Sequence, residues 1–101
     1  MTRRPGAAVP QVALDRAALI AELDALEIGG ARIECRTSED RRWWHSPDIA
    51  LQRKAARKCD GCPALEACAE FGLTYPYMTG VYGGRTESDR MRYAKKKEKD
   101  A

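Results

Sequence analysis

Leucines at helical spacing are the clearest pattern near the start of the chain. Over residues 11–28, Leu19, Leu23 and Leu26 recur on one side of a helical wheel, which predicts a helix with a single buried stripe. The glycine pair that follows favours a left-handed end to this helix. Residues 1–10 combine charge, proline and small side chains, so we predict a flexible segment ahead of the helix.

A polar stretch with no steady period covers residues 31–46, and we interpret it as a loop. Ser46, Pro47 and Asp48 are then expected to open a second helix. Serine can cap free amides, proline suits the first helical position, and aspartate favours the positive end of the helix dipole. Cys59 falls at the end of this helix, on the face expected to turn inward.

Two shorter helices are predicted further on, with a segment rich in helix breakers between them. Pro63 opens the first, and glycines and prolines then crowd residues 72–84, which predicts turns. Thr86 and Asp89 can cap each other at the start of the last helix, over about residues 87–97. The fold class is therefore all-α: a small irregular bundle of about four short helices, with a turn-rich segment before the last helix.

Three parts are expected along the chain. Residues 1–30 hold the flexible N-terminus and one helix, residues 31–84 the central domain, and residues 85–101 a basic C-terminal helix or tail. With 101 residues, 44% of them hydrophobic, the folded part is near the size at which metals or disulfides commonly add stability. Neither a long apolar run nor a secretory leader is present, so a soluble, cytoplasmic protein is expected.

Four cysteines form the candidate metal site: Cys35, Cys59, Cys62 and Cys68. In a reducing cytosol, clustered cysteines are more often ligands or redox groups than disulfides. Structural zinc sites usually pair two C-x-x-C turns, whereas this chain has one. Iron–sulfur clusters tolerate a distant cysteine and unequal gaps. The spacing alone favours a cluster and leaves zinc, disulfides and inert thiols open.

The order of these motifs resembles the WhiB-like proteins of actinobacteria and their phages, over about residues 32–97. The family pattern is one cysteine, a variable gap, C-x-x-C-x5-C, a G-[VI]-W-G-G turn and a basic tail. Here the turn is Gly80-Val81-Tyr82-Gly83-Gly84, with tyrosine where the family usually has tryptophan. The resemblance implies that residues 31–84 form a WhiB-like domain wrapped around a [4Fe–4S] cluster held by the four cysteines. It also implies that this cluster reacts with oxygen or nitric oxide.

The resemblance further implies a partner, the C-terminal region of the primary sigma factor of RNA polymerase. Trp43 and Trp44 are candidate anchors, because two adjacent rings do not easily both face inward. The alternative is that one ring covers the cluster and the other is exposed. The neighbouring His45 is not expected to be a ligand, since four cysteines complete the site. The residues expected at the partner interface are Trp43, Trp44, Gly80, Val81, Tyr82, Gly83 and Gly84.

Positive charge is concentrated at the C-terminus. The chain has a net charge of +3, and residues 85–101 hold seven Lys and Arg against four acidic residues. The resemblance implies that this tail touches promoter DNA, where cations would contact phosphates; a solvated end is the alternative. The candidate residues are Arg85, Arg90, Arg92, Lys95, Lys96, Lys97 and Lys99.

The predicted function is that of a cluster-dependent transcription regulator, monomeric apart from its sigma-factor complex. No catalytic acid–base pair or nucleotide-binding loop is evident, so an enzyme is not expected. Two alternatives stay open: a protein disulfide reductase that uses Cys59 and Cys62 after cluster loss, and a zinc-stapled adaptor. The reductase alternative is weakened because this chain lacks the predicted strand that precedes C-x-x-C in thioredoxin-like sites.

Overall fold

The computed structural model describes residues 10–100. This part of the chain is mostly helical, and its only extended pairing is a single antiparallel bridge. The all-α prediction is therefore confirmed. The elements are α1 (Gln11–Ile28), α2 (Glu34–Thr37), the 3-10 helix η1 (Arg41–His45), α3 (Ile49–Lys58), α4 (Leu65–Thr74) and α5 (Glu87–Asp100).

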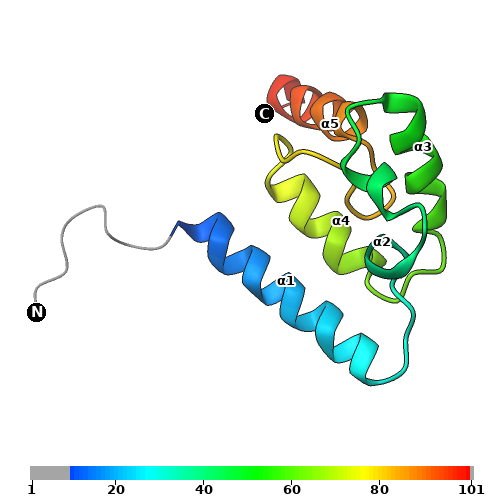
Figure 1. The fold of residues 1–101 in the computed structure, drawn as a ribbon. Helices are drawn as coiled ribbons and strands as arrows, with labels where there is room; N and C mark the ends of the chain where they lie inside the picture. The colour runs from blue at the N-terminus through cyan, green and yellow to red at the C-terminus, as the bar shows by residue number, and fades with distance from the viewer. Residues whose placement is uncertain (1–9, 101) are drawn as a thin grey trace, which may run out of the picture.

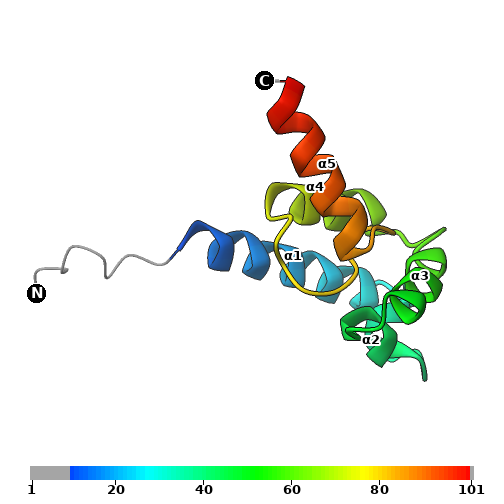
Figure 2. The ribbon, with the colours of Figure 1, turned by 90° about the horizontal axis from the view of Figure 1, so that it is seen from above.

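Helices α1 and α4 lie side by side, as both ribbon views show (Figures 1 and 2). The predicted leucine stripe of α1 is confirmed: Leu19 and Leu23 are each 8% exposed, and Leu26 packs against the same core. The flexible segment predicted ahead of α1 falls almost wholly on residues 1–9, which lie outside the described residues.

The interpretation of residues 31–46 as a loop is wrong in part, because they form α2 and η1. The backbone amide and the hydroxyl of Thr37 both donate to the carbonyl of Ile33, at 3.1 and 3.0 Å. The amide of Ser46 likewise donates to the carbonyl of Trp43 at 3.3 Å. Elements of four and five residues are too short to leave a period in the sequence.

Capping chemistry fixes the starts of α3 and α5. The predicted pairing at α5 is confirmed: the Thr86 amide donates to the Asp89 carboxylate and the Asp89 amide to the Thr86 hydroxyl, both at 3.1 Å. At α3 the cap is Asp48, whose carboxylate accepts from the Ala50 amide at 2.9 Å. Ser46 instead accepts from the Asp48 amide at 3.1 Å, so it orders the turn before the cap.

The core consists of two small clusters that meet at the cysteines. One holds Leu23, Ile33 and Ala64, and the other holds Trp44, Ala55 and Val81. Cysteines pack against both clusters, and Cys35 packs against each of them. Apolar groups of this size bury little area, so the core is weak by itself and has the thiols at its centre.

Helix α5 leads away from the other helices, with its later turns farthest out (Figure 2). Its first turn is tied to α3 by the buried Gln52, which accepts from the Glu87 amide at 3.1 Å and donates to the Ser46 carbonyl at 2.7 Å. The predicted division at residues 30 and 84 stays a prediction. Among the described helices, none is both long enough and apolar enough to cross a membrane.

Candidate metal centre

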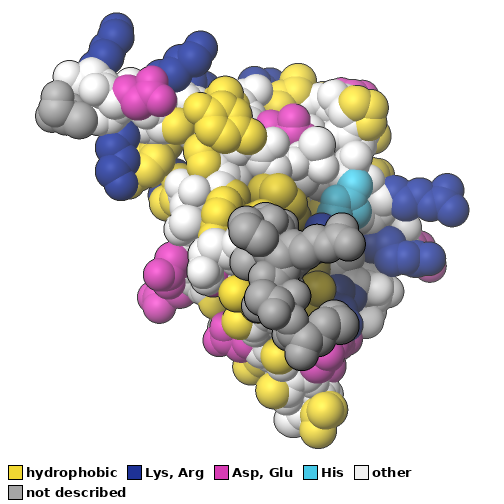
Figure 3. All heavy atoms as spheres, turned by 90° about the vertical axis from the view of Figure 1, so that its left-hand side faces the viewer, with side chains coloured by type: hydrophobic (Ala, Val, Ile, Leu, Met, Phe, Trp, Pro, Cys, Tyr) yellow, Lys and Arg dark blue, Asp and Glu magenta, His cyan; other side chains and the backbone are white. Residues whose placement is uncertain are grey.

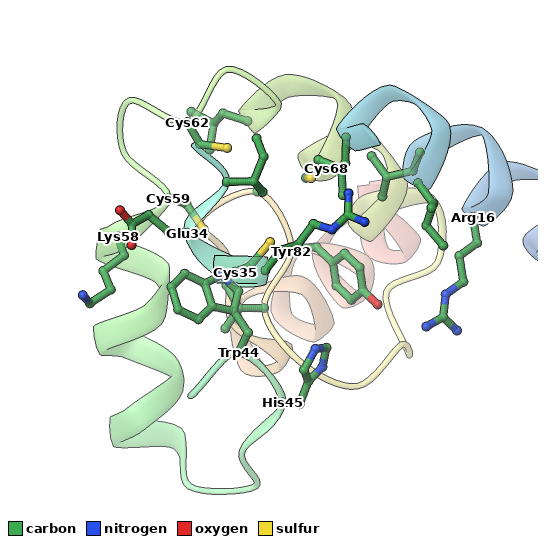
Figure 4. Close-up of a pocket in the computed structure, with 18 residues that line it drawn as sticks. Arg16, Glu34, Cys35, Trp44, His45, Lys58, Cys59, Cys62, Cys68 and Tyr82 are labelled. Atoms are coloured by element: carbon green, nitrogen blue, oxygen red, sulfur yellow. The ribbon is translucent and has the colours of Figure 1, made fainter. Parts of the chain in front are cut away.

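All four cysteines line one cavity of about 300 Å³. Their sulfur atoms stand around the same opening, between α2, the end of α3 and the start of α4 (Figure 4). Each cysteine is half-buried and none is in a disulfide. Residues from distant parts of the sequence are thus brought together as the cysteine prediction requires.

Helix α2 positions Cys35 against the core. Ile33, immediately before the helix, is completely buried. Arg36, immediately after Cys35, forms ion pairs at 2.8 Å with Asp24 and Glu27 of α1. An apolar anchor on one side and two ion pairs on the other hold the thiol of Cys35 toward the cavity.

The C-x-x-C segment is a tight turn. Cys59 is the C-cap of α3, and the amide of Cys62 donates to its carbonyl at 2.9 Å. Gly61 takes the third position of this turn with φ of 78°, a conformation that costs glycine little. Cys68 follows within the first turn of α4. The backbone amide of Cys68 donates to the carbonyl of the buried Ala64 at 2.9 Å.

The glycine turn predicted as a partner surface has a structural role in the site. Tyr82 and Arg85 exchange two backbone hydrogen bonds of 3.1 Å, and Gly83 and Gly84 between them have φ of 59° and 76°. A Cβ atom on Gly83 would lie 2.3 Å from the backbone nitrogen of Ala69 in α4. The turn therefore packs directly on the helix that carries Cys68, which explains the glycine there.

The other side of this turn faces η1, the 3-10 helix that holds both tryptophans. The Val81 amide donates to the Trp44 carbonyl at 2.8 Å, and a Cβ on Gly80 would lie 2.5 Å from the same oxygen. Val81 is 5% exposed and Gly80 is buried. Tyr82 is half-buried at the cavity and packs on Phe71, with ring centroids 5.4 Å apart. Of the five turn residues, Tyr82 offers the largest side chain at the opening.

The two tryptophans have different surroundings. Trp44 is 3% exposed and lines the cysteine cavity. Trp43 is half-buried beneath two lysines, with the Nζ atoms of Lys54 and Lys58 each 5.6 Å from its ring centroid. Trp44 therefore lies at the site and Trp43 outside it; Trp43 is half-buried, whereas the alternative interpretation of this pair expected an exposed ring. His45 is exposed at the rim of the cavity.

Arg90 corrects the list of expected DNA contacts. Its side chain is completely buried, and its guanidinium donates to the carbonyls of Gly80 and Arg85 at 2.8 and 2.9 Å and to that of Met78. It also lies over the Tyr82 ring, 5.2 Å from the centroid. A guanidinium occupied by three carbonyls holds α5 to the glycine turn and has no room for a phosphate. The other candidate cations of the tail are exposed: Arg85, Arg92, Lys95, Lys96, Lys97 and Lys99.

Sequence reasoning missed the roles of two buried polar residues, Gln52 and Arg90. Gln52 left a signal, because it is a polar side chain on the predicted inner face of α3. Arg90 left none, since its charge makes it look like the other tail cations.

Burial dominates the electrostatics of the thiols. It raises the pKa of Cys35 to about 11 and that of Cys68 to about 12, and the other cysteines raise both pKa values further. Burial also raises the pKa of Cys59, although hydrogen bonds from the Trp44 side chain and the Gly84 backbone oppose this. The raised pKa values of Cys35, Cys59 and Cys68 mean that these three thiols stay protonated unless a metal centre compensates their charge.

The site can thus be described as a small helical domain with four thiols around one cavity. A family model described as transcription factor WhiB matches residues 30–93. Because this match covers more than half of the chain, the protein belongs to the WhiB family of transcription factors.

The matches to individual relatives are shorter. The chain is 40% identical over 40 residues to the transcriptional regulator WhiB2 of Mycolicibacterium smegmatis, which covers 40% of this chain and 31% of the relative. It is 46% identical over 41 residues to the transcriptional regulator WhiB4 of Mycobacterium tuberculosis, covering 41% of this chain and 35% of the relative. The chain thus spans about a third of the length of the curated relatives it matches. No solved structure gives a significant match.

Proposed function

We propose that this protein is a cluster-dependent, cytoplasmic transcription regulator that binds the C-terminal region of the primary sigma factor and contacts promoter DNA through its basic tail. The observation that carries the proposal is the convergence of four cysteines on one cavity at the centre of a weak core, in a member of a transcription-factor family. Such a core needs a further cross-link to be stable.

The donor set fits a [4Fe–4S] cluster. Four thiols line the cavity, and a cluster of this type takes one thiolate for each of its four irons. A bound cluster would supply a four-point cross-link and a redox-active centre. Cys35, Cys59, Cys62 and Cys68 would hold it, while Trp44 and Val81 would exclude water from one side.

Zinc fits the cysteine spacing less well. A tetrahedral zinc site needs its sulfurs about 2.3 Å from one point. Structural zinc sites usually pair two C-x-x-C turns, and this chain has one, so the zinc-stapled adaptor is disfavoured.

The surroundings of Cys59 give a disulfide reductase no support. Reductases of the thioredoxin type depend on a thiol whose pKa is lowered at a helix N-terminus. Cys59 instead caps the C-terminus of α3, where the helix dipole disfavours a thiolate, and burial raises its pKa.

The proposed sigma-factor surface is the rim of the cavity. Tyr82 and the exposed His45 lie at its edge in Figure 4, and an amphipathic ring at such a place suits an interface anchor. Trp44, Gly80 and Val81 are buried, so their part would be to shape this rim from below. Trp43 lies on the outer side with Lys54 and Lys58.

Exposed cations near the end of α5 support the DNA contact. The space-filling view shows Lys and Arg side chains projecting around the far part of that helix (Figure 3). The sequence of α5 also holds four acidic residues, Glu87, Asp89, Glu98 and Asp100, which lower its net positive charge. We therefore expect the tail to bind phosphates weakly alone and usefully when the sigma factor holds it near a promoter.

The test is capture of the sigma C-terminal region by the anaerobically purified protein. We expect the cluster-loaded protein to capture it, Cys35→Ala to lose capture with the cluster, and Tyr82→Ala to weaken capture by about tenfold or more with the cluster retained. Tyr77→Ala is the matched control, since Tyr77 is 72% exposed and does not line the cavity. Capture by the cluster-free chain, or no capture by the loaded protein, would reject the proposed function.

A further inference from the structure

The exposed side of α3 carries four cations and no carboxylate. Arg53, Lys54, Arg57 and Lys58 are spaced one, three and four residues apart, which places them on one side of a helix. The buried residues of α3, Gln52 and Ala55, face the other way. No Asp or Glu occurs between Ile49 and Lys58. We call these four residues the α3 basic face.

Trp43 of η1 supports this face from the side. The ammonium groups of Lys54 and Lys58 both lie over its ring at 5.6 Å from the centroid. Such contacts hold lysine stems in place while leaving the charge exposed. Arg41 and Arg42, also exposed, precede the tryptophan and add to the positive field.

Most of this charge is not neutralised within the fold. In the described part of the chain, Lys58 pairs with Asp40 at 3.2 Å, and no ion pair involves Arg53, Lys54 or Arg57. The last helix differs in this respect, because acidic residues are interspersed with its cations. A positive electrostatic field along a rigid helix favours the binding of a polyanion.

We propose that the α3 basic face is a second phosphate-binding surface, which binds duplex DNA independently of the C-terminal tail; this proposal rests on the proposed function as a promoter-bound regulator. The face has the composition of a phosphate contact, with cations on a helix and no exposed Asn or Gln among them.

An acidic protein segment is the less favoured occupant. Protein interfaces depend on aromatic or aliphatic anchors that become buried. The large hydrophobic side chains that are clearly exposed in residues 10–100 are Leu14, Ile20, Ile28, Tyr77 and Tyr93. None of them belongs to α3 or η1, so the face offers charge without an anchor.

The experiment measures binding of the cluster-loaded full chain to a fluorescein-labelled duplex of arbitrary sequence, by anisotropy at several salt concentrations. Each phosphate contact contributes about 0.9 to the slope of log K against log salt. We expect Arg53→Gln/Arg57→Gln to reduce the steepness of this slope by about 1 to 2. Arg16→Gln/Arg32→Gln is the charge control, because it removes the same formal charge from two exposed arginines outside α3 and the tail, of which Arg32 pairs with Glu34 at 3.2 Å.

Three results decide the proposal. A shallower slope in the α3 variant, an unchanged slope in the control, and recovery in Arg53→Lys/Arg57→Lys would support it. An unchanged slope in the α3 variant, or an equal change in the control, would overturn it. Poly-glutamate binding lost in the α3 variant while the duplex slope is kept would also overturn it, in favour of an acidic protein partner.

Sigma capture by the same samples separates this proposal from the proposed function. The α3 variant is expected to keep full capture, since the two residues that it changes, Arg53 and Arg57, are exposed and do not line the cavity. If the unmodified protein fails to capture sigma but shows the α3-dependent salt slope, the proposed function is wrong and the α3 basic face stands.

Discussion

Replacing Gly83 by alanine should disrupt the metal centre although no ligand is touched. The added Cβ would lie 2.3, 2.4 and 2.5 Å from the nitrogen, Cα and Cβ atoms of Ala69. Two of these are backbone atoms of α4, so no flexible side chain can move aside. Relief requires the turn to separate from the helix that carries Cys68, one residue before Ala69.

The size of the effect follows from two contributions. Alanine at φ of 59° costs about 1–2 kcal/mol in backbone strain. Overlap with a packed helix costs about 1–3 kcal/mol more. Gly30→Ala isolates the first contribution, because Gly30 has φ of 97° and no atom within 4 Å of the added Cβ. Gly83→Ala should therefore lower the free energy of unfolding by about 2–5 kcal/mol, and Gly30→Ala by about 1–2 kcal/mol.

The assay is thermal unfolding of both variants with the metal centre loaded under anaerobic conditions, followed by near-UV circular dichroism and by the cluster absorbance. A difference of 1 kcal/mol shifts the midpoint of a domain of this size by about 4–8 °C. Gly83→Ala should thus unfold at least about 4 °C below Gly30→Ala, with faster loss of the cluster. Equal midpoints for the two variants would refute the proposed contact between the turn and α4.

Two further predictions concern buried charge and the thiols. Arg90→Gln should lower the free energy of unfolding by about 3 kcal/mol or more, because buried carbonyls lose a charged donor. The control Arg92→Gln changes an exposed side chain, so its free energy of unfolding should stay within about 0.5 kcal/mol of that of the unmodified protein. Equal urea midpoints for the two variants would contradict the packing of Arg90. In the metal-free chain, the pKa of Cys68 at about 12 means that thiolate forms only as the pH rises well above the ordinary value of 9.0. Iodoacetamide at pH 8 should therefore alkylate Cys68 at least about tenfold more slowly before than after denaturation in urea, and equal rates would show that this thiol is not buried without metal.

Local chemistry made part of the fold predictable. The stripe of Leu19 and Leu23 and the capping pair of Thr86 and Asp89 depend on residues within a few positions of one another, and both are confirmed. The four cysteines could be grouped because their spacing matches a family pattern as well as a ligand set. Their convergence on one cavity follows from packing that no single segment contains.

Tertiary contacts decided the features that were missed. Whether Trp43 or Trp44 turns inward depends on the Val81 amide, which binds the Trp44 carbonyl from 37 positions further along the chain. The burial of Arg90 depends on Gly72, where a Cβ would lie 2.9 Å from the Cδ of the arginine. Neither contact is visible in local periodicity or charge.

The most direct test of the central claim is the iron, sulfide and zinc content of the chain purified without oxygen. We expect about four iron and four sulfide per chain, negligible zinc, and a broad absorbance near about 400 nm. Alanine at any one of Cys35, Cys59, Cys62 or Cys68 should abolish stable retention of iron together with native near-UV dichroism. One zinc per chain without sulfide, or a single-cysteine variant that keeps its iron and its fold, would contradict the claim that four thiols hold a cluster on which this small core depends.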